Sequence, residues 1–420
     1  MALHPRRRAR RVFRYWRSEQ RTLRQGYAGL LLSSGGDLFA GLVLAFMTKS
    51  LDRLPGLFVL IPAAIGMRGN IFGALGSRLG TGVHSGVFEP SRERRGFLGQ
   101  NVHASFVLTL STSLFLAVAA RVVSPLFNSG PVITVWDFVM ISVLGGVLGS
   151  LVVGASAVGL AVMSFRHEWD IDSVSAPVVT AMGDVATLPA LWAVSYLVTF
   201  PATHQILSVS VGALLIVVCL VVTVRGLLTD LELARRVVRE SIPVLCLAGL
   251  LDILAGSVLD SRFDTVFSSI PALLILVPPF LEDTNALNGI LSSRLSSKLH
   301  LGLIEPKAWP EPLAFLDMSI QFVFAVSVFS LVGLSSQLIA VLTNRASPGL
   351  VDMLLISLFA GFLATIFACA IAYYGAVATF RFGLDPDNHG IPLGSSLMDL
   401  VGSICLILVI AALGIHGPHV

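Results

Sequence analysis

The chain has 420 residues, of which 55% are hydrophobic and only 13% are Asp, Glu, Lys or Arg, and its formal net charge is +3. A soluble domain has about 25% charged residues, because polar groups must cover its water-exposed surface. This composition therefore excludes a soluble enzyme, a disordered chain and a coiled coil, and it indicates a protein that crosses a membrane many times.

Long apolar segments follow one another along the chain. A bilayer core requires about 20 apolar residues per helix. Segments that meet this requirement lie near 28–48, 56–79, 100–123, 137–163, 177–200, 206–225, 242–260, 270–295, 316–342, 352–377 and 392–414. We therefore expect an all-α membrane protein with about eleven transmembrane helices and no separate soluble domain.

Positive charge is concentrated before the first span, where nine of the 28 Lys and Arg residues lie between Arg6 and Arg24. If this tail is cytoplasmic, most Lys and Arg residues of the other loops fall on the cytoplasmic side too, as the positive-inside rule requires. The pattern predicts a multi-pass protein of the cell membrane with a cytoplasmic N-terminus and, because the span number is odd, an outside C-terminus. The tail is expected to contact anionic lipid of the bilayer and no nucleic acid.

A segment of 34 residues occurs twice, beginning at Leu57 and again at Leu273. Twelve of the 34 positions are identical without a gap, whereas chance would give about three or four. With an offset of 215 residues, Asp37 pairs with Asp252 and Asp184 pairs with Asp399. The chain is therefore predicted to contain an internal duplication.

Each repeat contains five spans, and one further span near 206–225 lies between them. Six spans separate the start of one repeat from the start of the next, and because this number is even both repeats enter the membrane from the same side. We therefore expect parallel repeats related by a pseudo-two-fold axis along the membrane normal. A solute path is expected at their interface. The predicted division is a basic cytoplasmic tail, a first five-helix repeat, a linking helix with its loop, and a second five-helix repeat, at 1–27, 28–204, 205–240 and 241–420.

Four aspartates lie within predicted spans: Asp37 and Asp252 in the first span of each repeat, and Asp184 and Asp399 in the fifth. A carboxylate at this depth costs about 2.5–3.5 kcal/mol even on insertion scales, so such residues usually face a cavity and have a function. Each could instead be bonded to a Ser, Asn or Arg of a neighbouring helix, but their symmetric recurrence favours one shared site. Carboxylates without His or Cys suit a hard cation, above all Mg²⁺.

The second span of each repeat contains residues that interrupt its apolar pattern, at 66–70 and 282–285. We expect these helices to be broken there, because irregular backbone at membrane depth is tolerated where it lines a cavity. Freed carbonyl groups and the amides of Asn70 and Asn285 would then bind the cation or its hydration shell. A glycine hinge, or a buried ion pair between Arg68 and a carboxylate, is the alternative.

These residues resemble the MgtE-type magnesium transporters, and most of all their duplicated form, solute carrier family 41. The resemblance rests on VLIPAAIGMRGN and LGSRLGT within 59–81, on DIDSVSAPVVTAMGDVATLPAL at 170–191 and on DPDNHGIPLGSSLMDL at 385–400. It implies transport of Mg²⁺, with Mn²⁺ or Co²⁺ as other cargo, and a pore lined by Asp184 and Asp399. It also implies Asp260, at the end of AGSVLD, as a further metal-site residue. Relatives with one repeat act as dimers, so the fused repeats can work as a monomer.

The chain departs from the family in two places. Phe72 stands where the family has an acidic residue, and Ala45 stands where Asp260 has its counterpart in the first repeat. Bacterial relatives also carry large cytosolic magnesium-sensing domains, which this chain lacks. Regulation by magnesium would then use short loops, where the candidates are Asp170, Asp172, Asp385 and Asp387; simple capping of helix N-termini is the alternative.

Transport of a divalent cation along the interface of the repeats, past the intramembrane aspartates, is therefore the leading hypothesis for function. The alternative is a secondary transporter of another solute, coupled to Na⁺ or H⁺ through the same aspartates. An intramembrane enzyme is not expected, because the spans contain neither a nucleophile with its base nor a pair of zinc-binding histidines.

Overall fold

The computed structural model describes residues 14–17, 19–91, 93–127, 130–167, 171–199, 204–383 and 390–415. All regular secondary structure in these ranges is helical. The long helices are α2 (Gln20–Phe46), α4 (Leu57–His84), α5 (Phe97–Phe127), α6 (Val135–His167), α7 (Ile171–Val198), α8 (His204–Leu227), α9 (Glu232–Asp260), α10 (Ala272–His300), α11 (Pro312–Leu342), α12 (Leu350–Phe382) and α13 (Ile391–Ala412). A short helix α3 (Thr48–Arg53) and a π-helical turn η1 (Phe263–Phe267) join some of them.

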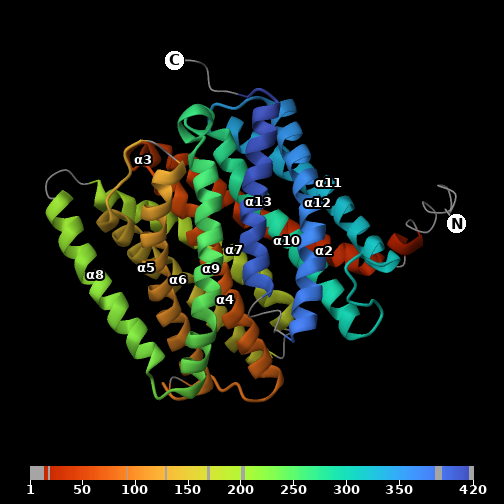
Figure 1. The fold of residues 1–420 in the computed structure, drawn as a ribbon, viewed down its shortest axis with the longest axis horizontal. Coiled ribbons are helices and arrows are strands. Elements are labelled where there is room, and N and C mark those ends of the chain that lie inside the picture. The colour runs from red at the N-terminus through yellow and green to blue at the C-terminus, as the bar shows by residue number, and fades with distance from the viewer. Residues whose placement is uncertain are drawn as a thin grey trace.

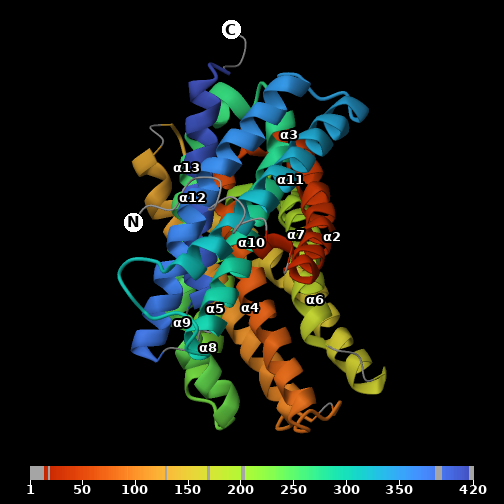
Figure 2. The ribbon, with the colours of Figure 1, turned by 90° about the vertical axis from the view of Figure 1, so that its right-hand side faces the viewer.

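Ten of these long helices are long and apolar enough to cross a membrane, and they confirm the prediction of an all-α, multi-pass membrane protein. The remaining long helix, α10, matches the predicted span at 270–295 but carries Glu282, Asp283, Arg294 and Lys298 among its apolar residues. It lies inside the bundle among the other helices (Figures 1 and 2). Helix α10 thus places charged side chains at the centre of an otherwise apolar protein.

The same set of helix contacts occurs in both halves of the chain. Within each half, the second helix (α4 or α10) packs against the third, fourth and fifth, and the first helix (α2 or α9) packs against the fifth. Helix α8 has no counterpart; it packs on α5, α6 and α9 at the edge of the bundle (Figure 1). The contacts therefore repeat with α2, α4, α5, α6 and α7 equivalent to α9, α10, α11, α12 and α13.

The first helix of each half crosses to the other half, so that α2 packs against α10 and α9 packs against α4. Glycine permits both crossings. A Cβ atom at Gly41 would overlap the carbonyl oxygen of Ile275, and a Cβ atom at Gly256 would overlap the carbonyl oxygen of Val59. Gly41 and Gly256 are equivalent residues of the two repeats, so the duplication seen in the sequence reappears as two matching helix crossings.

Both first helices begin at the same end of the bundle. Glu19, just before α2, contacts Arg294 near the end of α10, and the backbone N–H of Leu233, in the first turn of α9, donates to Gln100 near the start of α5. We call this end the basic end, because it carries Arg94, Arg95, Arg166, Arg225, Arg235, Arg236, Arg239, Lys298, Lys307 and Arg381. The two halves therefore run in the same direction, as expected for parallel repeats.

The predicted breaks in the second spans are wrong, because α4 is continuous from Leu57 to His84 and α10 is continuous from Ala272 to His300. Glycine in a helix costs only about 1 kcal/mol relative to alanine. An unpaired backbone group inside a membrane costs several kcal/mol, so a continuous hydrogen-bonded helix is favoured unless water reaches the backbone. Two glycines of α4, Gly66 and Gly82, instead allow the side chains of Asp252 and Phe97 to lie close to the helix axis.

Candidate functional site: two buried carboxylate pairs

Asp37, Asp184, Asp252 and Asp399 lie in the middle of four different helices, α2, α7, α9 and α13, and each is at most 5% exposed. The contacts of α2 with α7 and of α9 with α13 bring these residues together two by two. The structure therefore arranges the four predicted aspartates as two carboxylate pairs, one formed by each half of the chain.

In the first pair, the carboxyl group of Asp37 lies next to that of Asp184. The two helices approach closely because position 36 is glycine; a Cβ atom there would already be 3.1 Å from Cβ of Ala181. Helix α10 of the other half adds Glu282 and Asp283 to the surroundings of this pair. Four carboxyl groups therefore gather on this side of the interface.

Asp283 is completely buried and is held by a serine of α2. The hydroxyl of Ser34 lies 3.1 Å from Oδ1 and 3.2 Å from Oδ2 of Asp283. Because Ser34 is one helical turn before Asp37, this contact aligns the acidic segment of α10 with the aspartate of α2.

In the second pair, Asp252 and Asp399 both lie against Gly66 of α4. A Cβ atom at position 66 would be 3.0 Å from Oδ2 of Asp252 and 3.5 Å from Oδ2 of Asp399. Asn285 of α10 donates from Nδ2 to Oδ1 of Asp399 at 2.9 Å. The second pair therefore lies beside an amide and a glycine backbone, and Glu282 is near enough to act on Asp399 as well as on Asp184.

Neither oxygen of Asp37 or Asp252 has a hydrogen-bond partner within the part of the chain that the structure describes. The hydroxyl of Ser396 on α13 nevertheless lies close enough to Asp252 to act on its carboxyl group as a donor. A bond to a serine of a neighbouring helix therefore stays an alternative for Asp252. A buried polar group without a partner is unfavourable by about 1–3 kcal/mol, and a charged one by more. These oxygens require a proton, a water molecule or a cation.

Two other predicted site residues lie away from the carboxylate pairs. Asp260 is the last residue of α9, eight residues after Asp252, which corresponds to about 12 Å along the helix. Asn70 lies one helical turn after Gly66 on the side of the basic end, and the hydroxyl of Ser395 approaches its Oδ1 at 3.5 Å. Of the seven predicted residues, Asp260 is thus separated from the cluster and Asn70 adjoins it.

The predicted ion pair of Arg68 is absent from the described residues. Arg68 is buried, and its guanidinium donates to the backbone carbonyl of Ala64 at 2.9 Å and to the hydroxyl of Ser113 at 3.2 Å. It follows Gly66 by two residues, which turns it about 200° around the axis of α4. It therefore points toward α5 and α6, away from the carboxylates that lie against Gly66.

Glu282 and Asp283 were missed as site residues, although the sequence contains a signal for them. They stand in an apolar span at the positions that Gly66 and Met67 occupy in the first repeat. We interpreted them as residues that break a helix. Since the helix is continuous, two adjacent acids in its middle can only be accommodated by facing other polar groups.

The donor set fits a hydrated cation better than a bare one. The described residues contain no group of three or more His, Cys, Asp or Glu side chains arranged to hold a metal ion directly. Mg²⁺ gives up its water reluctantly and usually binds through one or two carboxylates plus several water molecules. Two carboxylate pairs with an amide beside one of them match that mode of binding.

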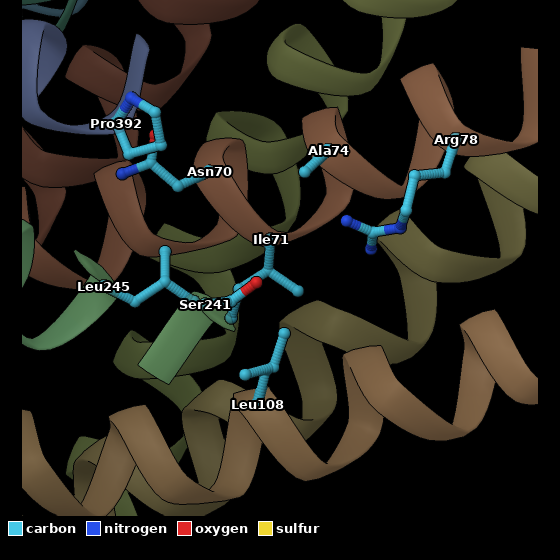
Figure 3. A pocket seen from close by; sticks show the side chains of 8 residues that line it. All are labelled: Asn70, Ile71, Ala74, Arg78, Leu108, Ser241, Leu245 and Pro392. Carbon is cyan, nitrogen blue, oxygen red and sulfur yellow. The ribbon is translucent and has the colours of Figure 1, made fainter. Parts of the chain in front are cut away.

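A cavity lies next to the second pair on the side of the basic end (Figure 3). The cavity is small, with a volume of about 10 Å³. Residues of α4, α5, α9 and α13 line it: Asn70, Ile71, Ala74, Arg78, Leu108, Ser241, Leu245 and Pro392. It therefore opens between the first half of the chain (α4 and α5) and the second half (α9 and α13), close to Asn70.

The candidates for regulation by magnesium cannot be placed. Asp170, Asp385 and Asp387 lie outside the described residues, and Asp172 is described only as part of the backbone of α7. Their regulatory role stays a prediction.

Comparison with known proteins agrees with the duplicated architecture. Residues 61–194 and 277–409 each match the family model MgtE, described as a divalent cation transporter. The chain is 24% identical over 407 residues to solute carrier family 41 member 3 of Rattus norvegicus, covering 90% of this chain and 84% of the relative. It is 25% identical over 398 residues to solute carrier family 41 member 2 of Homo sapiens, covering 90% and 68%.

No solved structure matches the chain. The two matched segments together cover more than half of the sequence, and one falls in each set of five helices. The chain therefore belongs to the MgtE family of divalent cation transporters, in the duplicated form found in solute carrier family 41, and it is a transporter and not an enzyme.

Proposed function

We propose that the protein carries Mg²⁺ across the cell membrane along the interface of its two halves, guided by the carboxylate pairs Asp37–Asp184 and Asp252–Asp399. One observation carries the proposal: the carboxyl oxygens of Asp37 and Asp252 are buried at the middle of the bundle, and none of them accepts a hydrogen bond of standard geometry from the described residues. Burying such a carboxylate within the membrane is energetically unfavourable unless a ligand binds its oxygens.

The cation is Mg²⁺ because the site offers only oxygen and amide groups. Softer divalent ions prefer imidazole or thiolate ligands, and both pairs lack them. Carboxylates that bind through a water layer attract the ion without removing its hydration shell, so that it can also leave. Mn²⁺ and Co²⁺ are the other ions proposed for the same path.

The two pairs act in sequence along one path. Asp283 acts on Asp37 and makes the surroundings of the first pair more negative, whereas Glu282 acts on both pairs. The first pair therefore binds the ion more tightly. The second pair, with the neutral Asn285, releases it. One chain is sufficient, because its two halves supply the two pairs, and the basic end faces the cytoplasm in agreement with the positive-inside rule.

Ion flux in proteoliposomes tests this proposal. Mg²⁺, Mn²⁺, Co²⁺, Ca²⁺ and Na⁺ are offered in turn, with and without a membrane potential. Asp184→Asn and Asp399→Asn should each reduce Mg²⁺ flux at least 100-fold and leave the protein folded. Asp352→Asn, which changes an aspartate in the first turn of α12 outside the cluster, is the matched control and should keep its flux.

Two results would refute the proposal. Flux that survives both aspartate substitutions would remove the carboxylates from the path. Flux of another solute that needs Na⁺ or H⁺ but no divalent cation would instead establish the coupled transporter.

A further inference from the structure

The cavity at the basic end is lined by hydrogen-bond donors that have no acceptor. Nη2 of Arg78 and Nδ2 of Asn70 are buried and have no hydrogen-bond partner in the described part of the chain. The hydroxyl of Ser241 opens into the same space. Figure 3 shows the guanidinium of Arg78 and the hydroxyl of Ser241 turned toward one another across it. Donors without an acceptor, one of them charged, indicate a site for an anion.

The equivalent arginine of the second half shows what Arg78 lacks. Arg294 donates from Nη2 to Oδ1 of Asp317 at 2.6 Å and to Glu19 at 3.1 Å, so two carboxylates compensate its charge. Arg78 instead donates from Nε to Oδ1 of Asn101 at 2.9 Å, and Asn101 is neutral. Asn101 is the counterpart of Asp317, so the first half keeps the arginine and loses its carboxylate.

The space at the two arginines differs in the same way. In the second half, the ring of Phe324 lies against Gly26, where a Cβ atom would be 3.0 Å from Cζ of the ring. The counterparts of these residues in the first half are Leu108 and Ser241, and both line the cavity. A smaller side chain and a hydroxyl have therefore replaced a phenyl ring and a glycine beside Arg78, which has no carboxylate partner among the described residues.

We propose that the Arg78 cavity binds one small inorganic anion of the chloride class, which links α4 of the first half to α9 of the second. An uncompensated buried charge is strongly destabilising, and an anion beside Arg78 removes that penalty. Most of the lining is apolar, and the few donors suit a weakly hydrated monovalent ion better than sulfate or phosphate. Along α4, Asn70 lies between Arg78 and Gly66, and the carboxylates of Asp252 and Asp399 lie at Gly66. The anion therefore lies closer to Arg78 than to these carboxylates.

Thermal unfolding of the purified protein tests this site. Chloride or bromide replaces gluconate at constant ionic strength and constant Na⁺, and no divalent cation is present. A ligand that binds only the folded state raises the midpoint with its concentration, and we expect a saturable rise of about 2–5 °C with chloride and bromide. Sulfate should give no saturable rise. Since Mg²⁺ is absent, the result does not depend on the proposed transport path.

Three variants locate the site. Arg78→Gln should abolish the difference between chloride and gluconate, whereas the matched control Arg294→Gln, at the arginine that already has carboxylates, should retain it. Asn101→Asp supplies the carboxylate that the second half has; this variant should be as stable in gluconate as in chloride. It also tests the site if Arg78→Gln does not fold.

Bromide in crystals of the protein should give an anomalous peak between Arg78 and Ser241. Equal midpoints in chloride and gluconate for the unmodified protein would overturn the proposal and leave the cavity as a water site. A halide effect that persists in both Arg78→Gln and Asn101→Asp would overturn it too, because the anion would then bind elsewhere.

Discussion

The second helices of the two halves, α4 and α10, have the same place in the fold but different charges. In α4, Gly66 and Met67 lie where α10 has Glu282 and Asp283. The opposite exchange occurs at the next residue, where α4 has Arg68 and α10 has Thr284. Because each of these helices contacts the first helix of the other half, the acids of α10 face Asp37 and the glycine of α4 faces Asp252. The two repeats thus share one backbone arrangement, but the substitutions between them make the two carboxylate pairs chemically different.

A second exchange concerns the helix face that points away from the carboxylates. The guanidinium of Arg68 occupies space next to Gly146, where a Cβ atom would overlap Nη2. In the second half, the ring of Phe329 occupies the equivalent space next to Gly361, where a Cβ atom would overlap the ring. Two equivalent glycines thus accommodate an arginine in one half and a phenylalanine in the other, so symmetric packing does not require symmetric chemistry.

The largest expected effect comes from substitutions at the two helix crossings, which both halves share. Gly41→Val and Gly256→Val each force side-chain atoms into a carbonyl oxygen of the crossing helix. Overpacking of this kind costs about 1–3 kcal/mol or more, and the backbone cannot move aside. We expect both variants to lose nearly all folded protein, measured as monodisperse yield by size-exclusion chromatography. Gly73→Val, at a glycine with no atom nearby, is the control. A stable Gly256→Val variant beside an unstable Gly41→Val variant would show that the crossings are not equivalent.

The next prediction concerns a substitution in α4 that makes its charge at one position the same as that of α10. Gly66→Glu gives α4 the acid that α10 has, and its Cβ atom would lie 3.0 Å from Oδ2 of Asp252. Both crowding and like charge oppose the second carboxylate pair, so we expect Mg²⁺ flux in proteoliposomes to fall about 100-fold. Gly66→Ala isolates the crowding and should reduce flux less. Equal flux in the alanine and glutamate variants would mean that charge at this position is unimportant.

A smaller effect is expected from the acids that belong to one half only. Glu282→Gln and Asp283→Asn each remove one negative charge near Asp37 and Asp184. Weaker attraction should raise the Mg²⁺ concentration for half-maximal flux about 10-fold and leave the maximal flux within about twofold. Glu305→Gln, in the connection after α10, is the control. A loss of maximal flux at unchanged half-saturation would indicate that these acids act in movement of the ion and not in its binding.

The smallest effect concerns the segment before α2. The hydroxyl of Tyr15 donates to Oδ1 of Asp317 at 2.6 Å, and Nε1 of Trp16 donates to Ser319 at 3.0 Å, so these bonds attach the segment to the second half. Tyr15→Phe removes the hydrogen bond that the hydroxyl donates to Asp317 and those that it accepts from Arg294 and Lys298. It should lower the free energy of unfolding by about 1–3 kcal/mol. Denaturant titration measures it, and Tyr374→Phe, on the exposed face of α12, serves for comparison. Equal losses in both variants would argue against a special role of the N-terminal contact.

The sequence predicted the spans and the four aspartates because apolar length and buried charge are local properties. It failed where the outcome depended on neighbours in space. The continuity of α4 follows from the cost of unpaired backbone inside the bundle, and the direction of Arg68 follows from which helices surround α4. The grouping of Asp37 with Glu282 and Asp283 depends on the crossing of α2 to the other half, which no motif records. Asn70 and Asn285 look equivalent in the sequence, but only Asn285 bonds to an aspartate.

The reciprocal crossing also affects how the chain is assembled during synthesis. Helix α2 emerges from the ribosome long before α10, its principal partner in the other half, has been made. Until α10 arrives, Asp37 has only α7 to shield it from lipid. The first five helices on their own would therefore be an unfinished intermediate, and a truncated protein that ends after α8 should be retained and degraded by the cell's quality control. Packing of α10 against α2 then brings Asp283 to the surroundings of Asp37.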